Sequence, residues 1–250
     1  MKRSQEWEAL ERRLTECERE LERARNDLQQ FAYSASHDLQ EPLRLIAGYS
    51  QLLHSRYHGT LDDKAHTFLD FITGSVRQME AMLKGLTEFS RVETHGGPFV
   101  PTRLDDALDR ALGHLQHEIR QSGARISRTP LPDARVDPEQ IERLFWHLIG
   151  NAIRFRSDAP PDIHLAASRE EQRWRILVRD NGIGIPARFA ERVFVVFQRL
   201  QPRDQSPGSG VGLSVCKRIV ERHGGTIWVD ATPAQGTTIG FSLPDRHLSE

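Results

Sequence analysis

A histidine beside an aspartate is the first place in this sequence where side chains could do chemistry. His37 and Asp38 put an imidazole next to a carboxylate. The carboxylate could take the imidazole proton as a ring nitrogen attacks phosphorus. His37 is two residues from Ala35 and Leu39, both apolar positions of an expected helix, so it should point outward from that apolar face. The pair is a candidate phosphoryl acceptor, although an exposed helical histidine is ordinary by itself.

A second set of candidates forms a polar stripe on a helix expected over residues 138–156. The stripe has the spacing i, i+4, i+7 and i+8 and consists of His147, Asn151, Arg154 and Phe155. An amide oxygen can ligate a hard cation, a guanidinium can pair with phosphate, and an aromatic ring can pack on a base. This combination suits a magnesium-bound nucleotide, and a solvated helix face is the alternative.

Two glycine-rich segments could bring the backbone close to a ligand. An expected strand ends in Asp180-Asn181-Gly182-Ile183-Gly184, where the carboxylate could accept a hydrogen bond from an exocyclic amine. Gly208-Ser209-Gly210-Val211-Gly212-Leu213 opens an apolar helix, whose N-terminus favours phosphate. It fits neither a dinucleotide fingerprint nor a Walker P-loop, because no strand directly precedes it and no Lys-Ser/Thr pair follows the glycines. Phe194 and Phe197, three residues apart, are more typical of a core.

The elements that must position these residues begin with a long helix. Residues 1–30 contain neither Gly nor Pro, and their apolar residues recur at alternating three- and four-residue steps. The seam is Trp7, Leu10, Leu14, Cys17, Leu21, Ala24, Leu28 and Phe31. It predicts a left-handed coiled coil, with a single solvated helix as the alternative. After Phe31 the spacing becomes four, four, four, which is a stutter, and Pro42 would tend to bend the helix.

A helical hairpin and an α/β domain complete the expected fold. A turn over residues 58–63 leads into a second amphipathic helix that ends near Val92, and two such hairpins would dimerise into a four-helix bundle. Residues 94–98, which include two glycines and a proline, mark a domain boundary. Beyond it, helical patterns cover 103–122, 138–156 and 210–223, and strand patterns cover 125–128, 163–167, 174–179, 226–229 and 237–243. The expected fold class is α + α/β, with a coiled coil over 1–30, a hairpin over 31–95 and an α/β sandwich over 96–250.

Composition excludes several classes of protein. Lys and Arg number 34 and Asp and Glu number 35, so the net charge of −1 gives no basic footprint for nucleic acid. No segment approaches the roughly 20 apolar residues of a membrane-spanning helix, and the N-terminus lacks the apolar core of a signal peptide. Cys17 and Cys216 are the two cysteines, which excludes a disulfide framework and fits a reducing cytoplasm.

The order and spacing of these blocks resemble the sensor histidine kinases of two-component systems. The resemblance covers residues 31–243, and residues 31–44, FAYSASHDLQEPLR, are most similar to the phytochrome-type branch. It implies that His37 is phosphorylated, that Asp38 is its base, and that Asn151 binds Mg²⁺. It implies an ATP site made of His147, Asn151, Arg154, Phe155, Asp180, Gly182, Gly184, Phe194, Phe197, Gly208, Gly210, Gly212 and Leu213. The ATP domain would have the Bergerat-type fold of gyrase and the heat-shock chaperone ATPases, with a mobile lid over 198–209.

Two positions depart from the family pattern. His147 stands where the family usually has asparagine, so nucleotide affinity is expected to differ. Glu41, four residues after the histidine, stands where many members have threonine or asparagine to orient a water molecule. A carboxylate there would repel an anionic phosphoaspartate, which argues against efficient phosphatase activity.

The expected function is ATP-dependent autophosphorylation of His37, followed by transfer to an aspartate of a response-regulator receiver domain. The expected partners are a second copy of the chain, that receiver domain, and an upstream sensor domain on the parent chain, because the 250 residues leave no room for a sensor. One alternative is a nucleotide-binding scaffold with little turnover, in which His147, Pro202 and Pro207 impair catalysis. Another is an ATPase clamp of the same fold, in which the His37 block has no role.

Overall fold

The computed structural model of the 250-residue chain describes residues 2–57, 59–200, 209–230 and 236–245. Within these ranges, the side chains of residues 2–11, 18, 21, 22, 24–33, 37 and 93 lie outside the description. The chain divides into two compact units, Met1–Ser90 and Arg91–Glu250. Each unit has its own fold, and the functional residues predicted from the sequence are distributed between the two.

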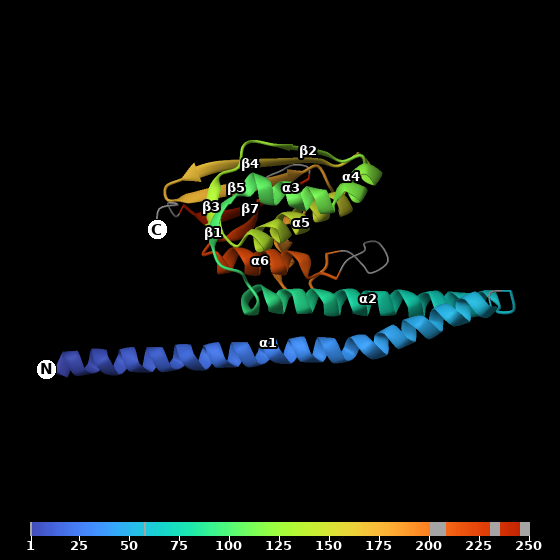
Figure 1. The fold of residues 1–250 in the computed structure, drawn as a ribbon, viewed down its shortest axis with the longest axis horizontal. Coiled ribbons are helices and arrows are strands. Elements are labelled where there is room, and N and C mark those ends of the chain that lie inside the picture. Colours follow the sequence, from blue (N-terminus) through green and yellow to red (C-terminus); the bar gives the residue numbers. More distant parts are fainter. Residues whose placement is uncertain (1, 58, 201–208, 231–235, 246–250) are drawn as a thin grey trace. The chain divides into compact units, whose positions relative to one another are not determined.

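The first unit is a hairpin of two long helices. α1 spans Lys2–Tyr57 and continues through Pro42, and α2 spans Asp63–Thr94, so the last turn of α2 belongs to the second unit. Figure 1 shows α1 as one continuous helix that changes direction in its second half. Asp62 caps α2, because its Oδ1 accepts a hydrogen bond from the Ala65 N–H at 2.7 Å. The predicted hairpin and its capped second helix are therefore present.

Apolar side chains of the hairpin fall into a buried set and an exposed set. Leu43 on α1 and Leu69 and Val76 on α2 are buried, and the last two are seven positions apart, about two helical turns. The exposed set is large and consists of Leu39, Leu45, Ile46, Tyr49, Leu52, Leu53, Tyr57, Phe68, Phe71, Ile72 and Met79. So many exposed large apolar side chains on two helices are typical of an interaction surface. In the expected coiled-coil seam Leu14 and Cys17 are exposed, and the other six seam side chains lie outside the described residues.

The second unit contains a five-stranded sheet with strand order β2-β4-β5-β7-β6. Its strands are β2 (Arg125–Arg128), β4 (Asp162–Glu170), β5 (Arg173–Asp180), β6 (Ile227–Asp230) and β7 (Thr237–Pro244). β2 pairs with β4 in parallel, and the other neighbours are antiparallel. β1 (Val100–Arg103) and β3 (Asp133–Val136) form a separate antiparallel pair that the sequence patterns did not predict.

Helices cover one face of this sheet (Figure 1). They are α3 (Leu104–His114), α4 (Gln116–Ser122), α5 (Pro138–Arg154) and α6 (Gly212–Arg222), and two short 3-10 turns, η1 (Ala187–Phe189) and η2 (Arg192–Phe194), precede α6. The single helix expected over 103–122 is divided at Leu115, which separates α3 from α4. Among the helices that the structure describes, none is both long and apolar enough to cross a membrane.

α5 carries the polar stripe and is fixed at its start and along one face. Asp137 is its N-cap and accepts hydrogen bonds from the backbone N–H groups of Glu139 and Gln140 at 3.2 and 3.3 Å, with Pro138 in the first turn. The apolar stripe of α5 is buried and consists of Ile141, Leu144, Phe145, Leu148, Ile149 and Ala152. Burial of this stripe leaves the polar stripe on a different side of the helix.

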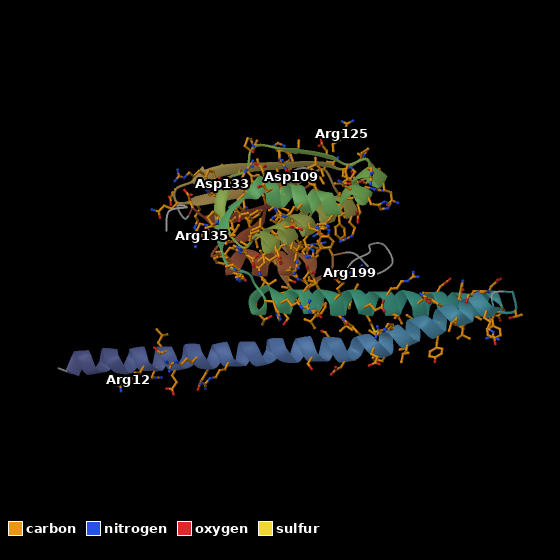
Figure 2. All side chains as sticks on the ribbon, in the orientation of Figure 1. Arg12, Asp109, Arg125, Asp133, Arg135 and Arg199 are labelled. Atoms are coloured by element: carbon orange, nitrogen blue, oxygen red, sulfur yellow. The ribbon has the colours of Figure 1, made fainter. Side chains whose placement is uncertain are left out.

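An ion pair ties the edge of the sheet to α3. Arg128 of β2 reaches Asp105 and Asp109 of α3, the latter labelled in Figure 2, at 3.1 and 2.5 Å. The hydrogen bond from Arg128 lowers the pKa of Asp109, and the same bond raises the pKa of Arg128. Such partly exposed pairs contribute about 0–1 kcal/mol each. Their role here is to fix the position of α3 on the sheet.

Candidate functional site

The end of α5 and the loop that follows β5 are in direct contact. The N–H of Ile183 donates to the carbonyl oxygen of Phe155 at 3.0 Å. At Gly182 a Cβ atom would lie 2.4 Å from the same carbonyl oxygen, so a glycine is needed there. Gly184 has a φ of 79° and packs against the carbonyl oxygen of Gly236. The predicted residues Phe155, Gly182 and Gly184 are thus brought together.

Asp180 closes β5 beside this contact, and one of its carboxylate oxygens is already engaged. Oδ1 accepts the backbone N–H groups of Gly182 and Thr237 at 2.8 and 3.1 Å. Burial raises the pKa of Asp180, and these two hydrogen bonds partly oppose the shift. Oδ2 takes part in neither bond. The carboxylate is therefore held rigidly with an oxygen suited to an amine donor of a ligand.

Gly236 and Thr237 belong to this site although the sequence patterns did not identify them. Gly236 has a φ of 83°, and a Cβ atom there would lie 1.9 Å from the carbonyl oxygen of Asp180. Thr237 opens β7 and pairs with Asp180 in the sheet. A glycine immediately before a predicted strand was the available signal for a close backbone approach. Its partner is far away in the sequence, and only the fold reveals it.

Further back along α5, His147 meets the start of α6. Gly212 is the first residue of α6, and a Cβ atom there would lie 3.1 Å from His147 Nδ1. Two residues earlier, Gly210 has a φ of 72° and its carbonyl oxygen accepts the N–H of Phe197 at 3.0 Å. Leu213 follows and is half-buried. The N-terminal end of a helix and an imidazole therefore lie together, an arrangement that suits an anion such as phosphate.

Asn151 and Arg154 form a hydrogen-bonded pair on the same stripe of α5. Nη1 of Arg154 donates to Oδ1 of Asn151 at 3.3 Å. Burial lowers the pKa of Arg154, and the Glu118 carboxylate opposes this shift. An anion that binds to a partly desolvated guanidinium forms charge-assisted hydrogen bonds with it and compensates for the water it has lost. In the described part of the chain, no group of three or more His, Cys, Asp or Glu side chains could hold a metal ion.

The other predicted residues are placed differently. Phe194 in η2 is 8% exposed, whereas Phe197 is 44% exposed and has a φ of 63°. Gly208 lies outside the described residues. His37 lies within α1, but its side chain is outside the description, and Asp38 beside it is exposed. The described nucleotide-site candidates all belong to the second unit, where Phe155 contacts the Asp180 loop and His147 contacts Gly212, and the predicted phosphoryl acceptor belongs to the first unit.

Comparison with known proteins adds family matches for both units. Residues 27–95 match the family described as the His Kinase A (phospho-acceptor) domain. Residues 136–247 match the family described as Histidine kinase-, DNA gyrase B-, and HSP90-like ATPase. His37 falls in the first match, and the α5, β5 and α6 residues described above fall in the second.

Individual relatives of the chain include phytochromes and a histidine kinase. Over 92% of its length the chain is 45% identical to cyanobacterial phytochrome A of Nostoc sp. and 42% identical to the phytochrome-like protein Cph1 of Synechocystis sp.. It spans 30% and 31% of the lengths of these relatives. The fold is shared with a crystal structure of the histidine kinase ThkA in complex with the response regulator TrrA. That likeness has a TM-score of 0.64 at 20% identity and covers 93% of this chain and 67% of that one. With both domains matched in the expected order, the chain belongs to the sensor histidine kinases, on the phytochrome branch.

Proposed function

We propose that this chain is an ATP-dependent protein histidine kinase that phosphorylates His37 and passes the phosphoryl group to an aspartate of a response regulator. The observation that carries the proposal is the arrangement along α5. Beside the end of the helix, the half-buried carboxylate of Asp180 suits an amine, and further back along the helix the His147 contact with the start of α6 suits phosphate. A nucleotide offers both groups in this order. The matches to the phospho-acceptor and ATPase families support the same function.

Each residue of the site has a role in holding ATP. Asp180 accepts the adenine amine through Oδ2, and the Phe155 ring packs on the base. His147 and Arg154 contact the phosphates. Backbone donors to the phosphates come from the start of α6, at Gly212 and Leu213, and from the glycines that precede it in the sequence, Gly208 and Gly210. Gly182 and Gly184 give the ligand access to the backbone, and Phe194 and Phe197 flank the lid over 198–209.

The residues present fit Mg²⁺ held mainly by its nucleotide. Mg²⁺ keeps several water molecules and takes phosphate oxygens, so one protein oxygen, Oδ1 of Asn151, is sufficient. This oxygen accepts a hydrogen bond from Arg154 at 3.3 Å. The Arg154 guanidinium would therefore turn from Asn151 to the phosphates in the complex. When bound, Mg²⁺ would supply neutralisation of polyphosphate charge.

Phosphoryl transfer uses His37 as the nucleophile and Asp38 as the base. A ring nitrogen of His37 forms a bond to the γ-phosphorus, the bond from this phosphorus to the bridging oxygen of ADP breaks, and the imidazole proton moves to Asp38. An aspartate oxygen of the response regulator then takes the phosphoryl group, and the nitrogen–phosphorus bond breaks. The protein contributes chiefly by orienting the groups. The phosphatase reaction is a separate one, in which water attacks the phosphoaspartate of the response regulator and releases phosphate. Exposed Glu41, one turn after His37, disfavours it because its carboxylate would repel that anion.

The active assembly is a homodimer. Its contacts are a coiled coil over 1–30 and a four-helix bundle from the hairpin over 31–95, and residues 96–250 form the ATP-binding domain. The exposed apolar side chains of the hairpin support this assembly, because burial against a second hairpin would remove them from water. The expected setting is cytoplasmic. The expected input is a sensor domain upstream on the parent chain.

The test is phosphorylation with radiolabelled ATP in the presence of Mg²⁺. The unmodified chain should acquire a label that is labile in acid and stable in base, and His37→Ala should acquire none. His54→Ala, which removes another histidine of α1, is the matched control and should be labelled. Labelling of His37→Ala would refute the site assignment. An unlabelled wild type that still binds ATP would favour the scaffold alternative.

A further inference from the structure

The segment between the hairpin and the ATPase fold is firmly bound to the second unit. The N–H of Gly97 donates to Oδ2 of Asp137 at 2.6 Å, and its carbonyl oxygen accepts from Nη2 of Arg222 at 2.8 Å. Val92, in the last turn of α2, is 2% exposed, and its carbonyl oxygen accepts from Nε2 of Gln140 at 2.6 Å. The sequence suggests a flexible boundary here, but hydrogen bonds to the second unit hold the segment at Val92 and at Gly97.

Arg222 lies at the centre of these contacts. Its Nη1 donates to Oδ2 of Asp137 at 3.1 Å and to Oε1 of Gln140 at 3.0 Å. Its guanidinium carbon lies 4.7 Å from the centroid of the Phe99 ring. The side chain of Arg222 is 19% exposed and that of Asp137 is 3% exposed, so the ion pair is shielded from water. Together with Val92 and Gly97, these residues form what we call the linker clamp: Val92, Gly97, Phe99, Asp137, Gln140 and Arg222.

Asp137 has two separate functions in this arrangement. Oδ1 caps α5 through the N–H groups of Glu139 and Gln140, while Oδ2 holds Gly97 and Arg222. Its own N–H donates to Nε2 of the buried His223 at 3.0 Å. The residue that starts α5 is therefore also the residue that binds the linker, so the two cannot move independently without breaking buried hydrogen bonds.

The packing at Gly96 shows how closely the linker lies against Arg222. A Cβ atom at Gly96 would lie 2.3 Å from Cζ of Arg222. Gly96 is not among the glycines with positive φ, so an alanine there is not excluded by its backbone conformation. Alanine at position 96 would instead displace the guanidinium. This gives a way to disturb the clamp without altering its charges.

The linker clamp and the nucleotide site lie at different ends of the same helices. α5 leaves the clamp and reaches Asn151, and α6 runs from Gly212 at the nucleotide site to Arg222 in the clamp. With a rise of about 1.5 Å per residue, the path along α5 from Asp137 is roughly 21 Å long and the path along α6 is roughly 15 Å long. Arg222 is therefore remote from the phosphates. Two packed helices connect it to them.

We propose that Arg222 is a positioning residue for phosphoryl transfer. The linker clamp makes the last turn of α2 a part of the ATP-binding unit. Movement that brings ATP to His37 then takes place in α2 before Arg91, and Gly96 and Gly97 are not the pivot. This inference rests on the proposed kinase function, because it concerns delivery of the phosphoryl group.

The test compares Arg222→Gln and Gly96→Ala with the unmodified full chain. At saturating ATP, both variants should phosphorylate His37 about 10- to 100-fold more slowly, the loss expected when a reacting group is slightly misplaced. ATP affinity should not change, because the nucleotide residues are untouched. Amide hydrogen exchange at Gly97 should be slow in the unmodified chain and faster in both variants. Arg222→Lys, which keeps a cation, should recover part of the rate, and Gly113→Ala, with nothing within 4 Å of its Cβ, is the matched glycine control.

Three results would overturn the proposal. The first is wild-type phosphorylation rates in both variants despite faster exchange at Gly97. The second is rapid exchange at Gly97 in the unmodified chain. The third is a parallel loss of ATP affinity and rate, which would show damage to the nucleotide site and not mispositioning. Failure of the unmodified chain to phosphorylate His37 would instead count against the proposed function, and Gly97 exchange would still report on the clamp.

Discussion

Replacing Asp180 with asparagine should change which nucleotide base the site accepts. Oδ1 of Asp180 is held by the N–H groups of Gly182 and Thr237 at 2.8 and 3.1 Å. An asparagine keeps both bonds by placing its amide oxygen at this position, which puts its NH₂ group where Oδ2 was. The adenine amine would then meet a donor and not an acceptor. A 6-oxo base, as in ITP, would meet a donor that it can use.

The expected size of the change follows from the hydrogen bonds involved. A hydrogen bond to a charged acceptor is worth about 1.5–3 kcal/mol, and a buried donor without a partner costs about 1–3 kcal/mol. Because these contributions are not fully additive, ATP binding to Asp180→Asn should weaken by about 2–4 kcal/mol, which is about 30- to 1000-fold. ITP should gain roughly 1 kcal/mol, about fivefold, from its new hydrogen bond.

The same substitution should not weaken the ligand-free fold at neutral pH. Burial raises the pKa of Asp180. A carboxyl group with a raised pKa contributes stability below its unfolded-state pKa, and this contribution is lost as pH rises through the folded-state value. Asparagine does not ionise. The melting temperature of Asp180→Asn without nucleotide should therefore equal or exceed that of wild type at neutral pH, and the difference should shrink as pH falls.

Calorimetric titration with ATP and ITP, together with thermal unfolding at several pH values, would check these outcomes. Asp162→Asn is the matched control, since it neutralises an exposed carboxylate at the start of β4. Unchanged ATP affinity in Asp180→Asn would show that the carboxylate does not contact the base. Equal losses for ATP and ITP with a lower melting temperature would show damage to the fold, and the reasoning about the base would fail.

Three other perturbations test packing, metal and assembly. Gly182→Ala would place Cβ 2.4 Å from the Phe155 carbonyl oxygen, so it should abolish nucleotide binding and destabilise the fold by about 1–3 kcal/mol, measured by denaturant titration; normal binding would contradict the close contact. Chelation of Mg²⁺ should weaken ATP binding to the unmodified chain more than to Asn151→Ala; equal sensitivity in a binding titration would remove Asn151 as the metal ligand. Ile46→Asp, at a side chain 46% exposed in the single chain, should convert a dimer to a monomer in light scattering while helical content is kept; a persistent dimer would place the interface elsewhere.

Features with a local or periodic cause could be predicted from the sequence. α5 is an example, because Asp137 and Pro138 mark its start and its apolar residues repeat with helical spacing. The hairpin was predictable for the same reason. The polar stripe from His147 to Phe155 then followed from the period of the helix.

Features that depend on distant partners could not be predicted in this way. Gly236 and Thr237 are adjacent to no motif, and their importance comes from Asp180, a partner that only the sheet brings near. β1 contains Pro101, a residue that argues against a strand, and its partner β3 lies about 30 residues further along the chain. The break at Leu115 also escaped prediction, although Gly113, two residues before it, was an available local signal.

In the linker, the residue types correctly indicate where one helix ends and the next begins, but they do not reveal the contacts between these two places. α2 ends at Thr94, just before Gly96 and Gly97, as their residue types indicate, and an aspartate, Asp137, stands at the cap position of α5. Neither signal shows that one oxygen of the cap binds Gly97 while Arg222 closes over the same segment. Small residues allow flexibility in a linker, but they equally allow a close approach to a neighbouring side chain. At Gly96 a Cβ atom would lie 2.3 Å from the Arg222 guanidinium carbon, so the glycine allows a close approach here, and the proposed pivot lies in α2.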